Sequence, residues 1–394
     1  MPDFNSLGLP KPTAQTRVVV AMSGGVDSSV TAGILAQQGY DVVGFTMQLY
    51  DHGSATSSSK SCCAGQDIYD AKRVADTLKI PHYVLDYEST FQKDVIEKFA
   101  DSYVAGETPI PCVLCNQTVK FRDLLKAARD IGGDCLATGH YAQRVMGEGG
   151  AQLHRAADPD RDQSYFLFAT TKTQLDYLRF PLGGMLKPEA RAIARKLGIA
   201  VADKPDSQDI CFVPTGSYTD IVQKLRPEAM QSGDFVHVDG RVLGQHKGVI
   251  NYTVGQRRGL GLGGEVEPLY VVRIDAANRR VVVGFKEDVL RDAFKLTGIN
   301  WLGAGETIPA DGFRAHVKLR NTQTPIAATV LPADVHGAAN VVLDTPAEAV
   351  TPGQACVFYE GERVLGGGWI ARDDAKAFVP HNMRKTHAKV AAEV

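Results

Sequence analysis

The chain has 394 residues, of which 44% are hydrophobic and 22% charged, and its formal net charge is −2. This balance is ordinary for a globular protein, and it excludes a disordered chain or a polycation that binds nucleic acid through bulk charge. The length is typical of two or three domains. Apolar runs such as 18–22 are too short to span a bilayer, and residues 1–12 lack the pattern of a secretory signal. We therefore expect a cytoplasmic protein with no membrane partner.

The first half of the sequence alternates strand-like and helix-like segments. The predicted strands cover 17–21, 41–47, 82–86 and 134–138, and the predicted helices cover 27–38, 68–78, 91–104 and 118–130. This order is typical of a doubly wound parallel sheet with helices on both faces.

The second half changes character after about residue 210. Short β-branched segments broken by glycines predict strands, including one over 249–255, and small antiparallel sheets or a barrel. We predict an α/β domain over 1–212, a small central β-rich domain over 213–292 and an antiparallel β-barrel-like domain over 293–394. The tail after 380 is expected to be frayed.

A glycine-rich loop joins the first predicted strand to the first predicted helix. Residues 23–29 read SGGVDSS. Glycines allow a tight turn, and the free N–H groups at a helix start can hold an anion. Asp27 can orient Mg²⁺ or cap the helix. A glycine turn with a capping residue is the simpler alternative, but strand, loop and helix in succession favour phosphate binding.

This loop resembles the PP-loop of the N-type ATP pyrophosphatases, which cleave ATP between the α- and β-phosphates and transfer AMP to a substrate oxygen. The resemblance implies adenylation chemistry with ATP and Mg²⁺, and no other dedicated metal. The ATP contacts that it implies come from the loop region and from two later strand ends: Ala21, Met22, Ser23, Gly24, Gly25, Val26, Asp27, Ser28, Met47 and Gly139.

Further strings narrow the resemblance. They are TPIPCVLCN at 108–116, ATGHYA at 137–142, RDQSYFL at 161–167, DSQDICF at 206–212, KGVINYTVGQRRGL at 247–260 and TPGQ at 351–354. In this order they resemble the tRNA-specific 2-thiouridylases, the MnmA family, over about 16–372. The resemblance implies ATP-dependent 2-thiolation of the wobble uridine, U34. Its implied partners are tRNAs such as the Lys, Glu and Gln isoacceptors and an upstream persulfide donor, either a cysteine desulfurase or a sulfur-relay protein.

Sulfur transfer needs a sulfur nucleophile, and a thiolate or persulfide is its natural carrier. By resemblance, Cys211 carries the persulfide and Cys115 is the nucleophile that forms a transient disulfide with it. Pro109 and Pro111 are expected to keep the segment before Cys112 out of helix, as an active-site loop. The other cysteines are interpreted as structural: Cys62, Cys63, Cys135 and Cys356.

Other interpretations stay open at this point. Cys112 and Cys115 have the spacing of half a zinc site, but no second half is visible. Together with Cys211 they can instead hold a [4Fe–4S] cluster, which related thiolases use. A small-molecule PP-loop ligase and an RNA-binding or sulfur-carrier protein without catalysis are further alternatives.

The resemblance also implies contacts to tRNA. These residues are Ile110, Pro111, Cys112, His140, Arg161, Asp162, Gln163, Arg320, Asn321 and Gln354, with Arg257, Arg258 and Lys318 as further basic candidates. Two positions depart from the family pattern. Ile110 stands where Asn is usual, and Cys112 stands where some members have Asp.

Overall fold

The computed structural model describes residues 4–50, 63–206, 210–213, 217–264, 267–333, 335, 337–348 and 350–372. They form two compact units. The first contains the described parts of Met1–Val95, Cys112–Phe212 and Glu362–Val364, and the second contains the described parts of Ile96–Pro111, Val213–Gly361 and Leu365–Val394. Cys62 and the tail after 380 lie outside the described residues.

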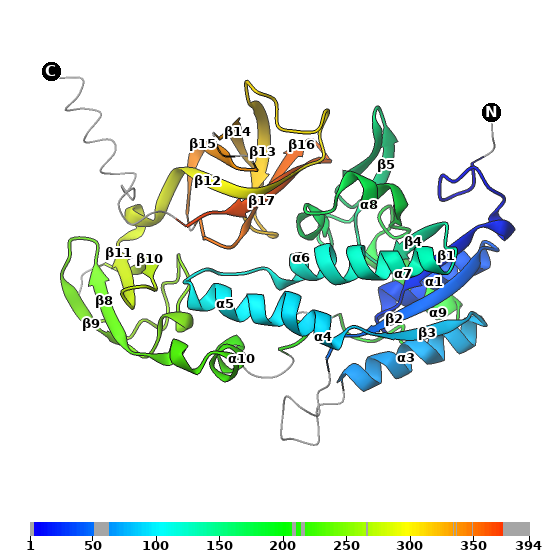
Figure 1. Ribbon diagram of the computed structural model, residues 1–394, viewed down its shortest axis with the longest axis horizontal. Coiled ribbons are helices and arrows are strands. Elements are labelled where there is room, and N and C mark those ends of the chain that lie inside the picture. Colours follow the sequence, from blue (N-terminus) through cyan, green and yellow to red (C-terminus); the bar gives the residue numbers. More distant parts are fainter. Residues whose placement is uncertain are drawn as a thin grey trace. The chain divides into compact units, whose positions relative to one another are not determined.

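The first unit is built on a five-stranded parallel sheet (Figure 1). Its strands are β1 (Arg17–Ala21), β2 (Asp41–Gln48), β3 (His82–Asp86), β4 (Cys135–Thr138) and β7 (Leu178–Arg179), in the order β3-β2-β1-β4-β7. All four neighbouring pairs are parallel. The four predicted strands are confirmed. The fifth has only two residues, too few for an apolar pattern to reveal it.

Helices follow these strands in the predicted order. They are α1 (Val26–Gln37), α3 (Cys63–Leu78), the run α4 (Glu88–Phe91), η2 (Gln92–Glu97) and α5 (Lys98–Val104), and the run α6 (Pro111–Cys115), η3 (Asn116–Leu124) and α7 (Leu125–Asp130). Of these, α5 belongs to the second unit. The unit adds η1 (Thr13–Gln15), the hairpin β5 (Gln143–Gly147) and β6 (Gly150–His154), η4 (Ser164–Leu167), α8 (Lys172–Tyr177) and α9 (Lys187–Lys196). The α/β architecture is confirmed. Among the described residues, no helix combines the length and apolar character that a membrane crossing requires.

The prediction that prolines keep the segment before Cys112 out of helix is wrong for Pro111. Helix α6 begins at this residue and continues through Cys115. Proline is favoured in the first turn of a helix, because its missing N–H would find no acceptor there. Cys112 and Cys115 are three positions apart on this helix and therefore share a face.

The second unit begins with α5 and α10 (Tyr218–Leu225), where the rings of Tyr103 and Tyr218 stack at 4.4 Å. The short helices η5 (Pro227–Met230), η6 (Val249–Asn251) and η7 (Lys286–Val289) accompany a four-stranded sheet. Its strands are β8 (Gly233–His237), β9 (Val242–His246), β10 (Tyr270–Asp275) and β11 (Arg280–Gly284), in the order β10-β11-β8-β9.

Two expectations fail in this sheet. Strand β11 pairs parallel to β8, so the sheet is not purely antiparallel. The predicted strand at 249–255 instead contains the turn η6, because Gly248 and Gly255 have φ values of +139° and +87° that interrupt extended backbone on both sides.

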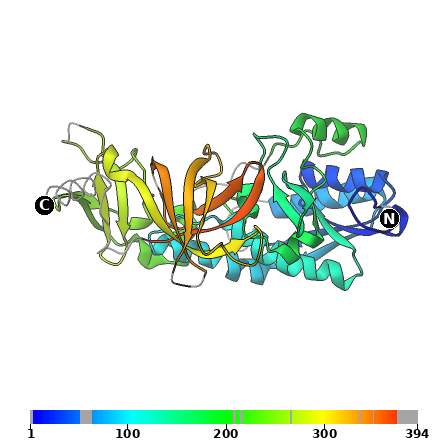
Figure 2. The same cartoon turned by 90° about the horizontal axis from the view of Figure 1, so that it is seen from above.

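A closed six-stranded antiparallel barrel follows. Its strands are β12 (Leu290–Trp301), β13 (Phe313–Lys318), β14 (Ile326–Pro332), β15 (Ala339–Glu348), β16 (Ala355–Glu360) and β17 (Arg363–Ile370). The order is β12-β15-β14-β13-β16-β17, and β12 also pairs with β17, which closes the barrel (Figure 2, yellow to red). Val317, Val330 and Val341 fill its interior together with Cys356, which confirms the buried position expected for this cysteine.

Candidate active site and RNA pocket

The glycine-rich loop directly follows β1. Gly24 has φ +74°, and a Cβ at this position would lie 2.1 Å from the carbonyl oxygen of Asp67, so both backbone conformation and space require glycine. The Ser23 N–H donates to Ser28 Oγ at 3.1 Å, and Ser29 Oγ donates to the Gly25 carbonyl at 2.7 Å. These bonds preform the loop.

The start of α1 has the properties of an anion site. Gly25 is its N-cap residue, and no side chain of the described chain caps it. The first N–H groups of the helix therefore keep their capacity to bind a phosphate. Gly139, which follows β4, packs against this start, because a Cβ there would lie 2.7 Å from Ser28 N. Met47 is half-buried near the end of β2, beside β1. The structure thus gathers the predicted ATP residues at the carboxyl ends of three adjacent strands, where doubly wound folds bind ligands.

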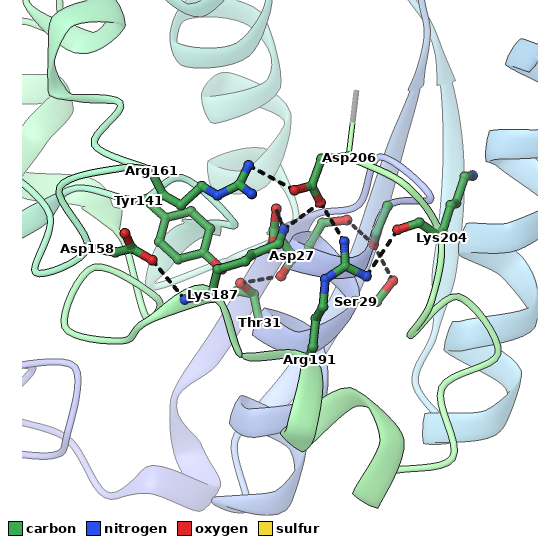
Figure 3. A network of polar contacts seen from close by, with 12 residues as sticks. Asp27, Ser29, Thr31, Tyr141, Asp158, Arg161, Lys187, Arg191, Lys204 and Asp206 are labelled. Atoms are coloured by element: carbon green, nitrogen blue, oxygen red, sulfur yellow. Dashed lines mark hydrogen bonds and ion pairs between the residues drawn. The ribbon is translucent and has the colours of Figure 1, made fainter. Parts of the chain in front are cut away.

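A partly buried charge network surrounds Asp27 (Figure 3). Lys187 Nζ lies 2.7 and 2.8 Å from the two carboxylate oxygens of Asp27 and 2.8 Å from Asp206 Oδ1. Arg161 and Arg191 each pair with Asp206 at 2.9 Å. Burial alone would raise the pKa of Asp206, but its bond to Lys187 and the arginine charges hold this pKa below the usual value.

The sequence reasoning missed Lys187, which is 160 residues from Asp27 and lies in none of the recognised strings. It also missed Lys204, whose Nζ lies 3.1 Å from the Gly24 carbonyl and 2.7 and 2.8 Å from Asp67 and Asp70. Lys204 therefore ties the loop to α3. Neither lysine carries a sequence signal, because only the folded chain brings it to the loop.

The same unit contains the three cysteines of the recognised strings, Cys112, Cys115 and Cys211, all of them free thiols, besides the buried Cys135. Cys115 is buried, whereas Cys112 and Cys211 are exposed. The Tyr50 hydroxyl donates to the Cys211 carbonyl at 2.8 Å, and the neighbouring Phe212 packs against Phe91. Surrounding protein atoms raise the pKa of the Cys211 thiol to about 12, and the charges of Cys115 and Cys112 contribute to this rise. Cysteines 96 residues apart in the sequence thus lie within electrostatic range of one another.

Lys120 is the cation that influences all three thiols. Surrounding protein atoms raise the pKa of Cys112 and of Cys115, and Lys120 opposes the rise at both and at Cys211. It lies in η3, five residues after Cys115. It follows the recognised string 108–116, and no role was predicted for it. At neutral pH the thiols are protonated, because burial outweighs this one positive charge.

His140 lies next to Gly139. Burial, with a smaller effect from Lys120, lowers the pKa of His140 to about 3, so its imidazole is neutral. Its Nδ1 is 2.9 Å from Thr138 Oγ1, and its ring packs edge-on against Phe121 and Phe180. Such a side chain can stack or form hydrogen bonds with a base, but it brings no positive charge to a phosphate.

The side chains that could bind a metal ion differ between the cysteines and the glycine-rich loop. Within the described ranges, no three Cys, His, Asp or Glu side chains lie together in a group that could hold a metal ion. Asp27 and the hydroxyls of Ser23 and Ser28 are oxygen donors that suit Mg²⁺ when nucleotide phosphates supply further ligands.

Residues 161–163 connect to this site. The Arg161 side chain is 40% exposed even with its pair to Asp206. Asp162 is buried, and it accepts hydrogen bonds from the N–H groups of Ala156 and Ser164. Gln163 Oε1 accepts from the Tyr141 N–H at 2.9 Å. Gln163 is uncharged and Asp162 is buried, so Arg161 is the residue of these three whose charge is accessible.

The second unit contains a polar cavity of about 360 Å³. It is lined by Thr108, Thr253, Val254, Gly255, Gln256, Arg320, Thr351 and Gln354. Two of the predicted tRNA residues, Arg320 and Gln354, thus share one pocket. Thr253 and Gln256 belong to a recognised string but were not assigned. Asn321, next to Arg320, has a buried Oδ1 without a hydrogen-bond partner in the described structure.

The turn at 351–354 fixes the start of the TPIPC string. Gln354 Nε2 donates to the Thr108 carbonyl at 2.8 Å, and the Thr108 N–H donates to the Pro352 carbonyl at 2.8 Å. Gly353 has φ +85°, and a Cβ there would lie 2.9 Å from Glu107 Cβ. Two residues beyond Thr108, Ile110 is buried. An apolar side chain is therefore accommodated at this position by packing.

Comparisons with known proteins agree with this geometry. The chain matches the models of a tRNA methyl transferase HUP domain over residues 16–215, a tRNA methyl transferase PRC-barrel domain over 219–285 and an aminomethyltransferase beta-barrel domain over 291–370. The tRNA-specific 2-thiouridylase MnmA of Rhodospirillum centenum is 63% identical over 380 residues, covering 94% of this chain and 96% of the relative. The chain belongs to the tRNA-specific 2-thiouridylase family.

A second 2-thiouridylase, from Paracoccus denitrificans, is 60% identical and covers 93% of this chain and 94% of the relative. Among solved structures, a 4-thiouridine synthetase–RNA complex with bound ATP aligns with a TM-score of 0.34 and 16% identity. It covers 54% of this chain and 50% of that one, too little to support an argument. The family resemblance expected from the ordered strings is confirmed by the close relatives.

Proposed function

We propose that this chain forms 2-thiouridine at the wobble position of tRNA in an ATP-dependent reaction. It belongs to a family whose named relatives are tRNA-specific 2-thiouridylases. The observation that carries the proposal is the placement of a phosphate loop and three mutually influencing cysteines in one compact unit. Adenylation and sulfur delivery are the two needs of this chemistry, and both kinds of group lie in that unit.

The phosphate loop serves the first step. The N–H groups at the start of α1 and the loop hydroxyls bind the β- and γ-phosphates, while Met47 and Gly139 line the nucleotide. Asp27 with Ser23 or Ser28 would hold Mg²⁺, which neutralises phosphate charge when bound. The uridine C2 oxygen attacks the α-phosphorus, the bond to the β-phosphate oxygen breaks, and pyrophosphate leaves. The C2 oxygen then carries AMP and becomes a good leaving group.

The cysteines serve the second step. The terminal sulfur of a Cys211 persulfide attacks C2, and AMP departs with the former carbonyl oxygen. The thiolate of Cys115 then attacks Cys211 Sγ, so the bond between the two persulfide sulfurs breaks and the base keeps the terminal one as 2-thiouridine. This step leaves Cys115 and Cys211 oxidised as a disulfide, which an external dithiol reduces. Both cysteines are free thiols in the described structure, as the start of this cycle requires.

The RNA contacts are proposed on chemistry and access. Arg320 in the polar cavity and Arg161 offer positive charge to phosphates, and neutral His140 offers a ring for stacking. Gln354 and Asn321 supply amides, whereas Ile110, Pro111 and Cys112 would line the base. We further propose that 1–212 forms the adenylation and thiolation domain, and that 213–292 and 293–394 bind tRNA.

The implied partners follow from the reaction. A persulfide donor, a cysteine desulfurase or a sulfur-relay protein, must load Cys211, and the substrates are tRNAs with a wobble uridine, such as the Lys, Glu and Gln isoacceptors. In bacteria, tRNA maturation takes place in the cytoplasm, where thiols are kept reduced. We therefore infer that the protein acts in the cytoplasm.

The test is reconstitution with purified chain, ATP, unmodified tRNA and a chemical persulfide donor. Mass spectrometry of the wobble nucleoside should detect 2-thiouridine. Asp27→Ala should abolish tRNA-dependent ATP–pyrophosphate exchange. Cys211→Ser and Cys115→Ser should keep that exchange and lose thiolation, because the phosphate loop is intact. Cys135→Ser and Cys356→Ser, which alter buried cysteines, serve as controls and should keep both activities.

Two outcomes would overturn parts of this proposal. Iron-dependent turnover of anaerobically purified protein, with no detectable Cys211 persulfide, would replace the persulfide mechanism with a [4Fe–4S] cluster on Cys112, Cys115 and Cys211. ATP–pyrophosphate exchange that needs a small molecule instead of tRNA would move the chain to the small-molecule ligases of the PP-loop class.

A further inference from the structure

The backbone at Cys211 is held by a side chain from a distant part of the sequence. Tyr50 lies two residues after the end of β2, and its hydroxyl donates to the Cys211 carbonyl at 2.8 Å. The two residues are 161 positions apart, and both belong to the first unit. Cys211 itself is exposed. The bond therefore restrains the backbone of Cys211 and leaves the thiol free to react.

Aromatic packing adds a second restraint at the same place. Phe91, at the end of α4, is fully buried and packs against two rings. Its ring centroid lies 6.0 Å from that of Tyr50 and 5.8 Å from that of Phe212. Ring pairs at this spacing are favourable beyond the area that they bury. Phe91 therefore holds both Tyr50 and the residue next to Cys211.

The position of Cys115 is set by helical backbone. Cys115 is the last residue of α6, and η3 begins at the next residue, Asn116. Asn116 Nδ2 donates to the Phe166 carbonyl at 3.2 Å. Cys115 is buried, and its charge contributes, after the surrounding protein atoms, to the raised pKa of the Cys211 thiol. With Cys115 held in this way, the distance between the two thiols depends on how Cys211 is held.

We propose that Tyr50 is a positioning residue that holds Cys211 within reach of Cys115 through its hydrogen bond to the Cys211 carbonyl. The inference rests on the proposed function for the roles of the two cysteines. Disulfide geometry requires Cα atoms about 4.4–6.8 Å apart, so a small displacement of one backbone matters. A contact that orders Cys211 before the reaction raises the effective concentration of one thiol at the other. By linkage, the bond from Tyr50 favours the disulfide as much as the disulfide favours the bond.

The experiment measures the redox equilibrium of the two cysteines in the full chain, in glutathione buffers at pH 7.5. Oxidation joins the two sulfurs, and the two thiols give two electrons and two protons to glutathione disulfide, which becomes two molecules of glutathione. After acid quenching and alkylation, mass spectrometry quantifies the peptide that contains the Cys115–Cys211 disulfide.

Tyr50→Phe removes the hydroxyl and keeps the ring against Phe91. We expect it to lower the equilibrium constant for the disulfide about threefold, the effect of one partly exposed hydrogen bond, which raises the reduction potential by about 14 mV. Tyr50→Leu removes the hydroxyl and the ring contact together and should lower the constant about tenfold. Tyr50→Phe alone decides the question if Tyr50→Leu does not fold.

Tyr83→Phe is the matched control. Tyr83 lies on the neighbouring strand β3, its side chain is 55% exposed, and its ring packs against Phe45. The same oxygen atom is removed from a tyrosine on the next strand, so the equilibrium constant should stay at its wild-type value.

The proposal is overturned if Tyr50→Phe leaves the equilibrium constant unchanged, or if Tyr83→Phe lowers it by the same factor. It is also overturned if the wild-type chain forms no Cys115–Cys211 disulfide at any glutathione ratio, because the two thiols are then not within reach. The equilibrium involves neither ATP nor tRNA, so its outcome is independent of thiolation. The expected effect in a chain that makes no 2-thiouridine would reject the proposed function and leave the positioning role of Tyr50 standing.

Discussion

The phosphate loop and the cysteine group lie in one unit, but they differ in electrostatic character. The loop is surrounded by paired charges, with Lys187 Nζ within 2.8 Å of carboxylate oxygens of both Asp27 and Asp206. The cysteines are influenced by one common cation, Lys120, and surrounding protein atoms raise the pKa of Cys211 to about 12. The loop is thus preorganised, whereas the thiols are protonated and unreactive at neutral pH. This difference suits the proposed order of steps, in which adenylation precedes sulfur transfer, because protonated thiols do not react prematurely.

The largest expected effect tests the preorganised loop. Gly24→Ala would combine a left-handed backbone with a Cβ 2.1 Å from the Asp67 carbonyl oxygen, so the loop must move. We expect ATP affinity, measured by calorimetry, to fall about 100-fold. Gly39→Ala is the control, because Gly39 has φ +84° but no atom within 4 Å of the added Cβ. It should cost about 1 kcal/mol of stability and leave ATP affinity unchanged. Equal ATP affinity in both variants would show that the loop tolerates rearrangement.

The next effect concerns the unreactive thiols. A raised pKa lowers the thiolate fraction at a given pH, so Cys211 at pH 7.5 should react about 50-fold more slowly with iodoacetamide than an ordinary cysteine, after allowing for its greater nucleophilicity. Its rate should rise nearly tenfold per pH unit up to about pH 10.5, because the pKa is about 12. The peptide-resolved rate between pH 7 and 10.5 checks this. A plateau near pH 9 would mean that Cys211 has an ordinary thiol pKa.

A smaller effect tests Lys120. Its charge lowers the pKa of each of the three cysteines, so Lys120→Met should raise these pKa values further and slow alkylation of Cys211 about fivefold at pH 8.5. Lys120→Arg keeps the charge and should retain the wild-type rate. If Lys120→Met leaves the rate unchanged, Lys120 does not affect the Cys211 thiol. The contrast with the loop would then be larger, because the loop has paired cations and the thiols would have none that lowers their pKa.

The smallest effect concerns the cavity in the second unit. Arg320 is exposed at its edge, and removing one phosphate contact should lower the slope of log affinity against log salt by about one. Arg320→Ala should therefore weaken tRNA binding about threefold in moderate salt and leave ATP affinity unchanged. Filter binding at several salt concentrations measures the slope, with Arg314→Ala as a control on an exposed arginine paired to Asp344. Parallel lines for Arg320→Ala and wild type would remove Arg320 from the interface.

Sequence reasoning predicted the features that depend on local patterns. The parallel strands, the glycine-rich turn between β1 and α1 and the barrel follow from apolar runs, glycine placement and β-branched segments. It failed where one residue type fits two local structures. Proline disfavours the helix interior but is favoured in the first turn, and Pro111 starts helix α6. Lys187 and the cavity residues Thr253 and Gln256 were missed for another reason. Their roles arise from partners far along the chain, and a single sequence does not encode those contacts as spacing.

The helix α5 lies early in the chain but belongs to the second unit. Tyr103 stacks on Tyr218, and Asp101 pairs with Arg226 at 2.8 Å. At a synthesis rate of roughly 5–20 residues per second, the ribosome delivers Tyr218 roughly 6–23 s after Tyr103. The hydrogen-bond partners of Thr108, which are Pro352 and Gln354, are synthesised later still. During translation the segment 96–111 therefore leaves the exit tunnel before its partners exist. The TPIPC string reaches its final position only after the turn at 351–354 has been synthesised.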